Sequence, residues 1–208
     1  MDHNHRVPGA RVFLLSPAHL GGERARILLR DEASFDLATR VRARGGAPVG
    51  EIFAFLSGLY FRGKLAYVSA FGAAPHPEVA PAYVITSNRG LCTVDARFDR
   101  RALQELGTVD IDARNDAYRK PLVRDAKKLQ RRIGEAEVVL LGSIASTKYT
   151  EVLGEIFGDR LVSPVAFVGL GDMSRGSIML KAARAGVELP YAAVRALAGA
   201  KVRSCRAR

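Results

Sequence analysis

The stretch from Glu137 to Gly158 constrains the fold of this chain more than any other. Val138 to Leu141 form a continuous run of β-branched and aliphatic residues, of the kind that is buried on both faces of a parallel sheet. Gly142 then permits a sharp turn. An amphipathic helix that packs back on the sheet is predicted next, because apolar residues follow at the spacing i, i+3, i+4, i+7. These residues are Tyr149, Val152, Leu153 and Ile156, and Gly158 ends the helix.

The turn of this unit lies at the carboxyl end of a strand and the amino end of a helix. Free backbone N–H groups and the positive end of the helix dipole can hold a phosphate or carboxylate there. Ser143, Ser146 and Thr147 add hydroxyl donors. The turn is neither a nucleoside-triphosphatase loop nor a dinucleotide fingerprint, because the second glycine is absent and Lys148 follows the hydroxyl residues. In the alternative interpretation, Ser146 or Thr147 only caps the helix.

The length of 208 residues suits one α/β domain. We expect a flexible segment over residues 1–10, a single domain over 11–200 and a basic tail over 201–208. Hydrophobic residues make up 48% of the chain, yet no apolar run approaches membrane-spanning length and no hydrophobic leader is visible. Because the only cysteines are Cys92 and Cys205, we expect a cytoplasmic protein with reduced thiols and no membrane partner.

The net charge of +11 favours a polyanionic partner, and most of the 32 basic residues are arginine, which suits bidentate contacts with phosphate. The expected partner is DNA or another nucleic acid, or alternatively a phosphorylated small molecule. An arginine-rich composition inherited from a GC-rich genome is the competing explanation. Basic residues cluster on predicted helices at 24–44 and 124–132. Most of the first cluster is expected to form a solvated helix face.

Further strands are predicted at 11–15, 83–87 and 161–168. The last is either one strand interrupted by Pro164 or two short ones, and the interruption suggests a sheet edge or bulge. A short additional strand is predicted at 108–111. Alternation of these strands with helical patterns predicts an α/β fold of three layers, an open, mainly parallel sheet with helices on both faces.

Several helices are predicted between the strands. The longest pattern runs from Glu51 to Phe71, and its exposed face would present Tyr60, Arg62 and Lys64 to a ligand. Alternatively, Tyr60 belongs to the core and the two cations extend their charged ends to solvent. Other predicted helices cover 23–29, 36–44 and 99–106, one that Pro121 opens, and one that Ser174 caps and Gly186 ends.

Four predicted strands each lead into a small, polar, glycine-bearing loop, at 16–22, 86–90, 142–148 and 169–176. If the strands are parallel, these loops meet at the edge of the sheet where open α/β folds bind ligands. The side chains gathered there suit an anionic ligand, and they include one carboxylate and one imidazole for acid–base work. Because no zinc spacing and no serine elbow is present, we expect no metal, no other cofactor and no catalytic triad. The candidate residues are Ser16, His19, Asn88, Arg89, Gly142, Ser143, Lys148, Asp172, Ser174 and Arg175.

Asp172 and Arg175 lie in the most glycine-rich loop, where the backbone can approach a ligand while a carboxylate and a guanidinium point at it. In the alternative interpretation they form an ordinary ion pair.

Four short motifs are distributed over the predicted loops and helices: Ser16-Pro-Ala, Phe61-Arg-Gly-Lys-Leu-Ala-Tyr67, Ile85-Thr-Ser-Asn-Arg-Gly-Leu91 and Val138-Val-Leu-Leu-Gly-Ser-Ile-Ala-Ser-Thr-Lys-Tyr149. Together they resemble, over residues 11–180, the motifs of the YaaA-like and deazaguanine-associated proteins, whose α/β core is similar to that of uracil-DNA glycosylases. The resemblance implies a site for a nucleobase or nucleic acid at the sheet edge. The water-activating Gly-Gln-Asp-Pro-Tyr segment and the His-Pro-Ser-Pro loop of those glycosylases are absent here, so Asp172 and His19 would have to fill their roles.

Three functions follow as hypotheses. The first is a DNA- or nucleobase-processing enzyme of glycosylase-like architecture, in which Asp172 orients water or stabilises a sugar cation while Arg89, Lys148 and Arg175 hold phosphates. The second is an enzyme or sensor that binds a nucleotide or phosphosugar in the same crevice. The third is a non-catalytic nucleic-acid-binding protein that uses the basic helices.

Overall fold

A six-stranded sheet forms the centre of the described part of the chain, residues 9–145 and 147–198 of a computed structural model. The strand order is β4-β3-β1-β6-β7-β8. The four inner strands are parallel, and the short edge strands pair antiparallel with their neighbours. This confirms the predicted α/β class with a mainly parallel sheet. The strands are β1 (Arg11–Leu15), β3 (Ala82–Ile85), β4 (Leu91–Thr93), β6 (Glu137–Leu141), β7 (Leu161–Pro164) and β8 (Tyr191–Ala193).

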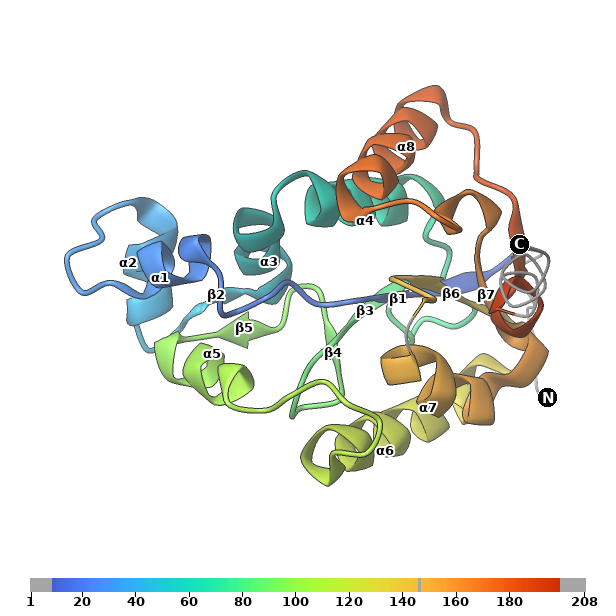
Figure 1. Ribbon diagram of the computed structural model, residues 1–208, viewed down its shortest axis with the longest axis horizontal. Coiled ribbons are helices and arrows are strands. Elements are labelled where there is room, and N and C mark those ends of the chain that lie inside the picture. The colour runs from blue at the N-terminus through green and yellow to red at the C-terminus, as the bar shows by residue number, and fades with distance from the viewer. Residues whose placement is uncertain (1–8, 146, 199–208) are drawn as a thin grey trace, which may run out of the picture.

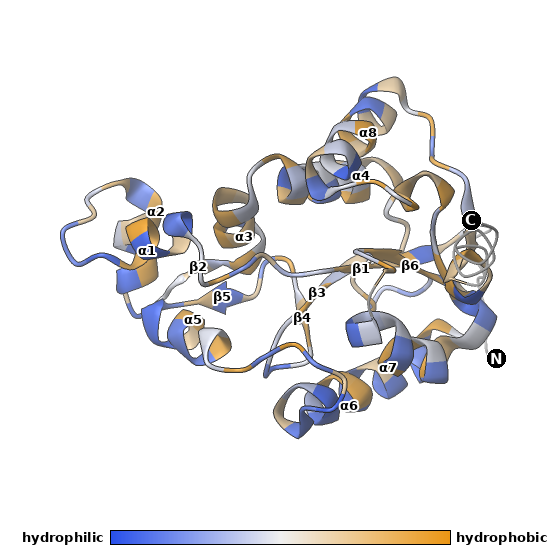
Figure 2. Ribbon diagram, viewed as in Figure 1, coloured by the Kyte–Doolittle hydropathy of each residue, from blue (hydrophilic) through white to orange (hydrophobic). Residues whose placement is uncertain are grey.

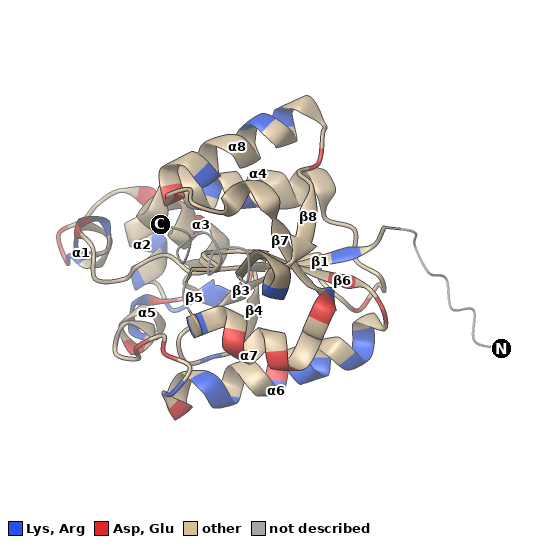
Figure 3. Cartoon of the chain, turned by 45° about the vertical axis from the view of Figure 1, so that its right-hand side comes forward, with Lys and Arg blue, Asp and Glu red and all other residues tan. Residues whose placement is uncertain are grey.

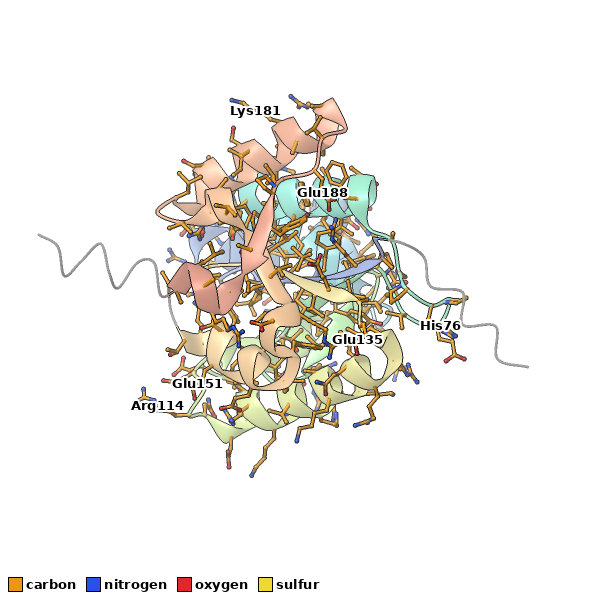
Figure 4. All side chains as sticks on the ribbon, turned by 90° about the vertical axis from the view of Figure 1, so that its right-hand side faces the viewer. His76, Arg114, Glu135, Glu151, Lys181 and Glu188 are labelled. Carbon is orange, nitrogen blue, oxygen red and sulfur yellow. The ribbon has the colours of Figure 1, made fainter. Side chains whose placement is uncertain are left out.

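Alternate residues of the central strands feed two separate cores. In β1, Phe13 and Leu15 pack on one side of the sheet, whereas Val12 and Leu14 pack on the other. The register pairs Val12 with Val138 and Leu14 with Leu140, so β6 repeats the alternation. Side chains fill the space on both sides of the sheet (Figure 4). This burial on both faces is the reason that the strand sequences are continuously apolar.

Helices cover both faces of the sheet, as predicted (Figure 1). On one face lie α3 (Val49–Ser57), α4 (Leu59–Phe71) and α8 (Asp172–Ala185), and on the other lie α6 (Asp116–Ile133) and α7 (Thr147–Phe157). Hydrophobic residues dominate α3, whereas α6 and α7 carry hydrophilic residues on their outer sides (Figure 2).

A small lobe lies beyond the carboxyl end of β1 (Figure 1). It contains a two-stranded antiparallel sheet of β2 and β5. Its elements are α1 (Glu23–Leu29), α2 (Asp36–Arg42), β2 (Ala47–Pro48), β5 (Arg97–Phe98) and α5 (Arg100–Gly107).

The single helix predicted from Glu51 to Phe71 is wrong, because Gly58 separates α3 from α4. Gly58 has φ of 56° and ψ of −124°, a conformation that other residues rarely adopt. A Cβ atom at this position would lie 2.6 Å from Nη1 of Arg24. The chain therefore needs glycine at the break, where the two helices change direction.

Two predicted helix starts are also wrong. Helix α6 begins at Asp116 and not at Pro121, because Asn115 caps it by accepting a hydrogen bond from the N–H of Ala117 at 3.1 Å. Helix α8 begins at Asp172 after the extended Gly171, so Ser174 lies inside the helix and does not cap it.

The strand predicted at 108–111 is absent, since these described residues pair with no other strand. Of the strand predicted at 161–168, the first half forms β7, and Val165–Phe167 form a 3-10 turn, η2. Pro164 does not mark the sheet edge, because its strand β7 lies between β6 and β8, and Pro164 itself pairs with Tyr191 of β8. The short antiparallel strands β2, β4, β5 and β8 were not predicted.

The predicted unit from 137 to 158 is confirmed, with α7 burying Tyr149, Val152 and Leu153 and with Gly158 following at φ of 57°. No helix in the described ranges is both long and apolar enough to cross a membrane. The predicted flexible segment, except for residues 9 and 10, and the basic tail, Ser146 and Cys205 lie outside the described residues.

Candidate functional site

A cavity of about 720 Å³ lies at the carboxyl edge of the main sheet, next to the small lobe. From β1 the chain continues to β3 on one side and returns later to β6 on the other. The point between β1 and β6 is therefore a topological switch point, where open α/β sheets bind their ligands. The volume lies in the usual range for small-molecule sites.

All four predicted loops contribute to this cavity. Ser16 and His19 come from the loop after β1, Ser143 and Lys148 from the turn after β6, and Asp172 from the start of α8. The wall is completed by apolar and aromatic side chains of α3, α4 and α7 and by the segment after α5. Other lining residues include Phe53, Leu56, Tyr60, Thr86, Ser87, Leu106, Ile111 and Tyr149.

Two glycines bring α4 and α8 into close contact beside the cavity. A Cβ atom on Gly63 would lie 2.7 Å from the carbonyl oxygen of Gly176, and one on Gly176 would lie 2.8 Å from that of Leu59. Only glycine fits at such a crossing. The crossing places Tyr60 and Lys64 of α4 close to Arg175 of α8.

Lys64 is fully buried and contacts the loop after β1. Its Nζ donates to the carbonyl oxygen of Ser16 at 2.8 Å and to Oγ of Ser16 at 2.7 Å. The ammonium also lies 3.9 Å from the ring centroid of Tyr60. Two oxygens and an aromatic face can thus take its three N–H donors.

The environment lowers the pKa of Lys64 from 10.5 to about 7. Burial is the main cause, because it removes water from the charged form. The negative charge of Asp172 raises this pKa, and the positive charge of Arg175 lowers it. Such a lysine can gain or lose a proton near neutral pH.

Arg175 is the second buried cation. Its Nε and Nη2 each donate to the carbonyl oxygen of Phe167 at 3.3 Å. Its Nη1 lies 3.4 Å from Oδ1 of Asp172, so the ion pair considered as an alternative is present. The side chain of Asp172 is 66% exposed. Among the described residues, Lys64 and Arg175 are the buried charged side chains, and no carboxylate is buried with them.

The hydroxyl of Tyr60 is buried and has no hydrogen-bond partner of normal geometry. Arg175 and Ser16 are near enough to lower its pKa, but burial, the largest cause, raises it. Tyr60 also lines the cavity, so a residue with an unsatisfied hydroxyl borders the space that a ligand would fill.

Ser143 and Lys148 line the cavity, and Gly142 adjoins it without lining it. Oγ of Ser143 accepts a hydrogen bond from the N–H of Ala145 at 3.3 Å, and the backbone of Lys148 accepts one from the hydroxyl of Tyr118 at 2.8 Å. A Cβ atom on Gly142 would lie 3.0 Å from Cβ of Ser16. Gly142 therefore permits the close approach of two loops.

Seven predicted site residues do not line the cavity, although all of them are described: Arg62, Lys64, Asn88, Arg89, Gly142, Ser174 and Arg175. Of these, Lys64 and Arg175 are buried. Arg62 and Ser174 are exposed on α4 and α8. Asn88 donates from Nδ2 to the carbonyl oxygen of Glu105 at 3.0 Å, and Arg89 pairs with the Glu105 carboxylate at 2.9 Å. Arg89 lines a separate hollow of about 300 Å³ together with Arg44, Arg97 and Arg101.

Several residues of the cavity wall were not predicted from the sequence. Thr86 and Ser87 belong to a loop that was identified, but their hydroxyls were not singled out. Tyr149 was assigned only to the helix pattern. Nothing in the sequence indicates that the segment 106–111 closes the cavity, because it reaches the site from the small lobe.

The second basic cluster lies far from the cavity. Helix α6 ends at Ile133, just before the amino end of β6, whereas the cavity lies at the carboxyl end of that strand. Five residues of strand separate the two edges by about 16 Å. Lys127, Lys128, Arg131 and Arg132 are all exposed there, and Figure 3 shows the basic residues along α6.

Among the described residues, no three His, Cys, Asp or Glu side chains are grouped so that they could hold a metal ion. The chain matches no protein-family model, no curated protein and no solved structure. The site's function must therefore be inferred from its own chemistry.

Proposed function

We propose that this chain is a DNA- or nucleobase-processing enzyme of glycosylase-like architecture, which admits an extruded base into the cavity. The observation that carries the proposal is the cavity itself. It lies at the switch point, and it combines apolar and aromatic walls from Phe53, Leu56 and Tyr149 with the polar side chains of His19 and Ser143. A nucleobase has the matching form, since its faces stack and its edges are polar.

In this proposal Asp172 orients a water molecule or stabilises a sugar cation, and Lys148 holds a flanking phosphate. Asp172 is well suited because it lines the cavity while most of its side chain remains accessible. His19, which also lines the cavity, is the second acid–base candidate. Arg89 and Arg175 are withdrawn as phosphate ligands of this cavity, because one lies in another hollow and the other is buried behind the wall.

The motifs that resemble YaaA-like proteins support the same proposal. Ser16 and the turn after β6 belong to those motifs, and both line the cavity. A nucleobase site at the sheet edge is what this resemblance implies.

The experiment is a product assay with labelled single- and double-stranded DNA that carries a panel of modified bases, at low and moderate salt. We expect base release that falls at least about 100-fold in Asp172→Asn, since a positioned acid–base group contributes that much. Asp116→Asn is the matched control, because Asp116 is an exposed carboxylate that pairs with Lys120 away from the cavity. Unchanged turnover in Asp172→Asn would remove the assigned role.

A mononucleotide panel in the same assay tests the second candidate, an enzyme or sensor for a nucleotide or phosphosugar. Tight mononucleotide binding without affinity for DNA would favour it.

The exposed basic face of α6 favours a third candidate, a non-catalytic nucleic-acid-binding protein. In that case charge reversal at Lys127, Lys128, Arg131 and Arg132 abolishes DNA binding and Asp172→Asn does not. Because the two surfaces lie at opposite edges of the sheet, these variants separate the candidates.

A further inference from the structure

A positive charge without a buried counter-charge lies behind the inner end of the cavity, the part of its wall that Ser16 and Tyr60 form. Burying Lys64 beside Arg175 is unfavourable, because each cation loses its hydration and the two repel each other. Asp172 is the carboxylate that pairs with Arg175, but it is mostly exposed and the contact is long. Within the described residues, no buried carboxylate offsets this charge.

Two hydroxyl groups separate these cations from the cavity. Oγ of Ser16 accepts a hydrogen bond from the Lys64 ammonium, so its own proton must be donated elsewhere. Its hydrogen bond to the carbonyl oxygen of Leu141 is long, at 3.4 Å, beyond the usual O–H···O distance. The hydroxyl of Tyr60 is buried without a hydrogen bond of normal geometry, although Arg175 and Ser16 lie close enough to lower its pKa. Both residues line the cavity.

We propose that the inner end of the cavity binds an oxyanion of the ligand, a carboxylate or a phosphate group, through the hydroxyls of Ser16 and Tyr60. Lys64 polarises the Ser16 hydroxyl from behind, and the charges of Lys64 and Arg175 offset that of the ligand. This inference goes beyond the proposed function, because it assigns the charge of the innermost ligand group and holds whichever reaction the site performs.

An oxyanion explains the arrangement better than a neutral acceptor. A neutral carbonyl oxygen could accept the same two hydrogen bonds, but it would leave two buried cations without compensation. An anion also favours the protonated form of Lys64. Its affinity should therefore rise as the pH falls through the pKa of Lys64. The groups that face this ammonium are Ser16 after β1, the Tyr60 ring on α4, and Asp172 and Arg175 on α8.

Calorimetric titration with matched pairs of ligands tests the proposal. Orotate and uracil differ by one carboxylate, and uridine 5′-monophosphate and uridine differ by one phosphate. We expect the charged member of at least one pair to bind at least about tenfold more tightly, as a hydrogen bond to a charged group implies. The pair that shows the difference identifies the carboxylate or the phosphate as the source. Equal affinities in both pairs would overturn the proposal.

Variants show whether the preference arises at the inner end. Tyr60→Phe removes one oxygen atom. It should weaken the binding of the charged ligand by about 10- to 100-fold and change the binding of the neutral member of the pair little. Ser87→Ala is the matched control, because this hydroxyl also lines the cavity but already donates to the carbonyl oxygen of Leu106 at 2.6 Å. Lys64→Met should abolish the preference and its pH dependence. If Lys64→Met does not fold, Tyr60→Phe still decides, since an unchanged preference in that variant would contradict the proposal.

The outcomes also separate this inference from the proposed function. Preference for the charged ligands without base release from any DNA supports the oxyanion site and removes the proposed enzyme. Base release without such a preference supports the proposed enzyme and removes the oxyanion site.

Discussion

The cations of α6 and the cations beside the cavity show how differently the same charge behaves in two regions. Lys127, Lys128 and Arg131 are exposed on α6, where water solvates them at little cost. Lys64 and Arg175 are buried beside a cavity, where charge is unfavourable unless something compensates it. The exposed cluster accounts for part of the net charge of +11, yet it identifies no particular ligand. The buried pair adds little to the composition, but it is much more informative about function.

The largest expected effect concerns the cost of burying Lys64. Its pKa is about 7 in the folded chain and 10.5 ordinarily, so between these values the unfolded chain binds more protons. The free energy of unfolding should therefore gain from this group as the pH rises from about 7 to about 10.5, and the full penalty should remain below pH 7. At about 1.36 kcal/mol per pKa unit, the gain is roughly 3 to 5 kcal/mol.

Lys64→Met should lack this gain. Urea unfolding of the wild-type chain and of Lys64→Met from pH 6 to pH 10 gives the free energy of unfolding of each, and the difference between them measures the gain. Subtraction matters, because the raised pKa values of Tyr60 and Cys92 act in the opposite direction in both proteins. Parallel stability curves would mean that Lys64 is not buried as a costly cation.

The next prediction concerns the close crossing of α4 and α8, which places Lys64 near Arg175. Gly63→Ala places a Cβ atom 2.7 Å from the backbone of Gly176, which cannot easily move. We expect a loss of about 1 to 3 kcal/mol in the free energy of unfolding, as overpacking usually causes. Gly154→Ala is the control, since Gly154 lies inside α7 with nothing within 4 Å of its Cβ position. The control should gain up to about 1 kcal/mol from helix propensity, and a similar gain in Gly63→Ala would contradict the close crossing.

A smaller effect with opposite signs is expected for two buried tyrosines. Tyr60→Phe removes a buried hydroxyl without a hydrogen bond of normal geometry and should stabilise the ligand-free protein by about 1 kcal/mol. Tyr118→Phe removes a hydroxyl that donates to the carbonyl oxygen of Lys148, and should destabilise by about the same amount. Thermal unfolding of the two variants decides the matter. Destabilisation of both would show that Tyr60 has a partner within the protein.

The sequence predicted the main features of the fold because they depend on local patterns. The apolar runs of β1 and β6, the helix of α7 and the loops after the strands follow from periodicity and from glycine positions. Local patterns cannot show a break such as Gly58, which depends on a positive φ and on Arg24 from a distant helix. The edge strands β4 and β8 are too short to leave a periodic signal.

The convergence of the predicted loops on one cavity was predicted, but the burial of the cations behind its wall was not. Ser16, Ser143, Lys148 and Asp172 converge because parallel strands end at one edge. The burial of Lys64 was not predictable, since it results from the packing of α4 on α8 and a lysine on a helix ordinarily reaches solvent. For the same reason sequence could not show that Arg89 pairs with Glu105 away from the cavity.

The smallest expected change in stability concerns the basic face of α6. Replacing Lys127, Lys128, Arg131 and Arg132 by glutamine should change the free energy of unfolding by less than about 0.5 kcal/mol, because exposed charges away from close partners contribute little. Ligand binding in the cavity should not change either, since the cluster lies at the opposite edge of the sheet.

Affinity for DNA should change if this face contacts phosphates, because each lost phosphate contact lowers the logarithmic slope of binding against salt concentration by about 0.9. Titration of this variant with DNA at several salt concentrations therefore measures what the exposed charges do. An unchanged slope would mean that the face does not contact nucleic acid, and reduced binding of a small ligand in the cavity would mean that the two regions are coupled.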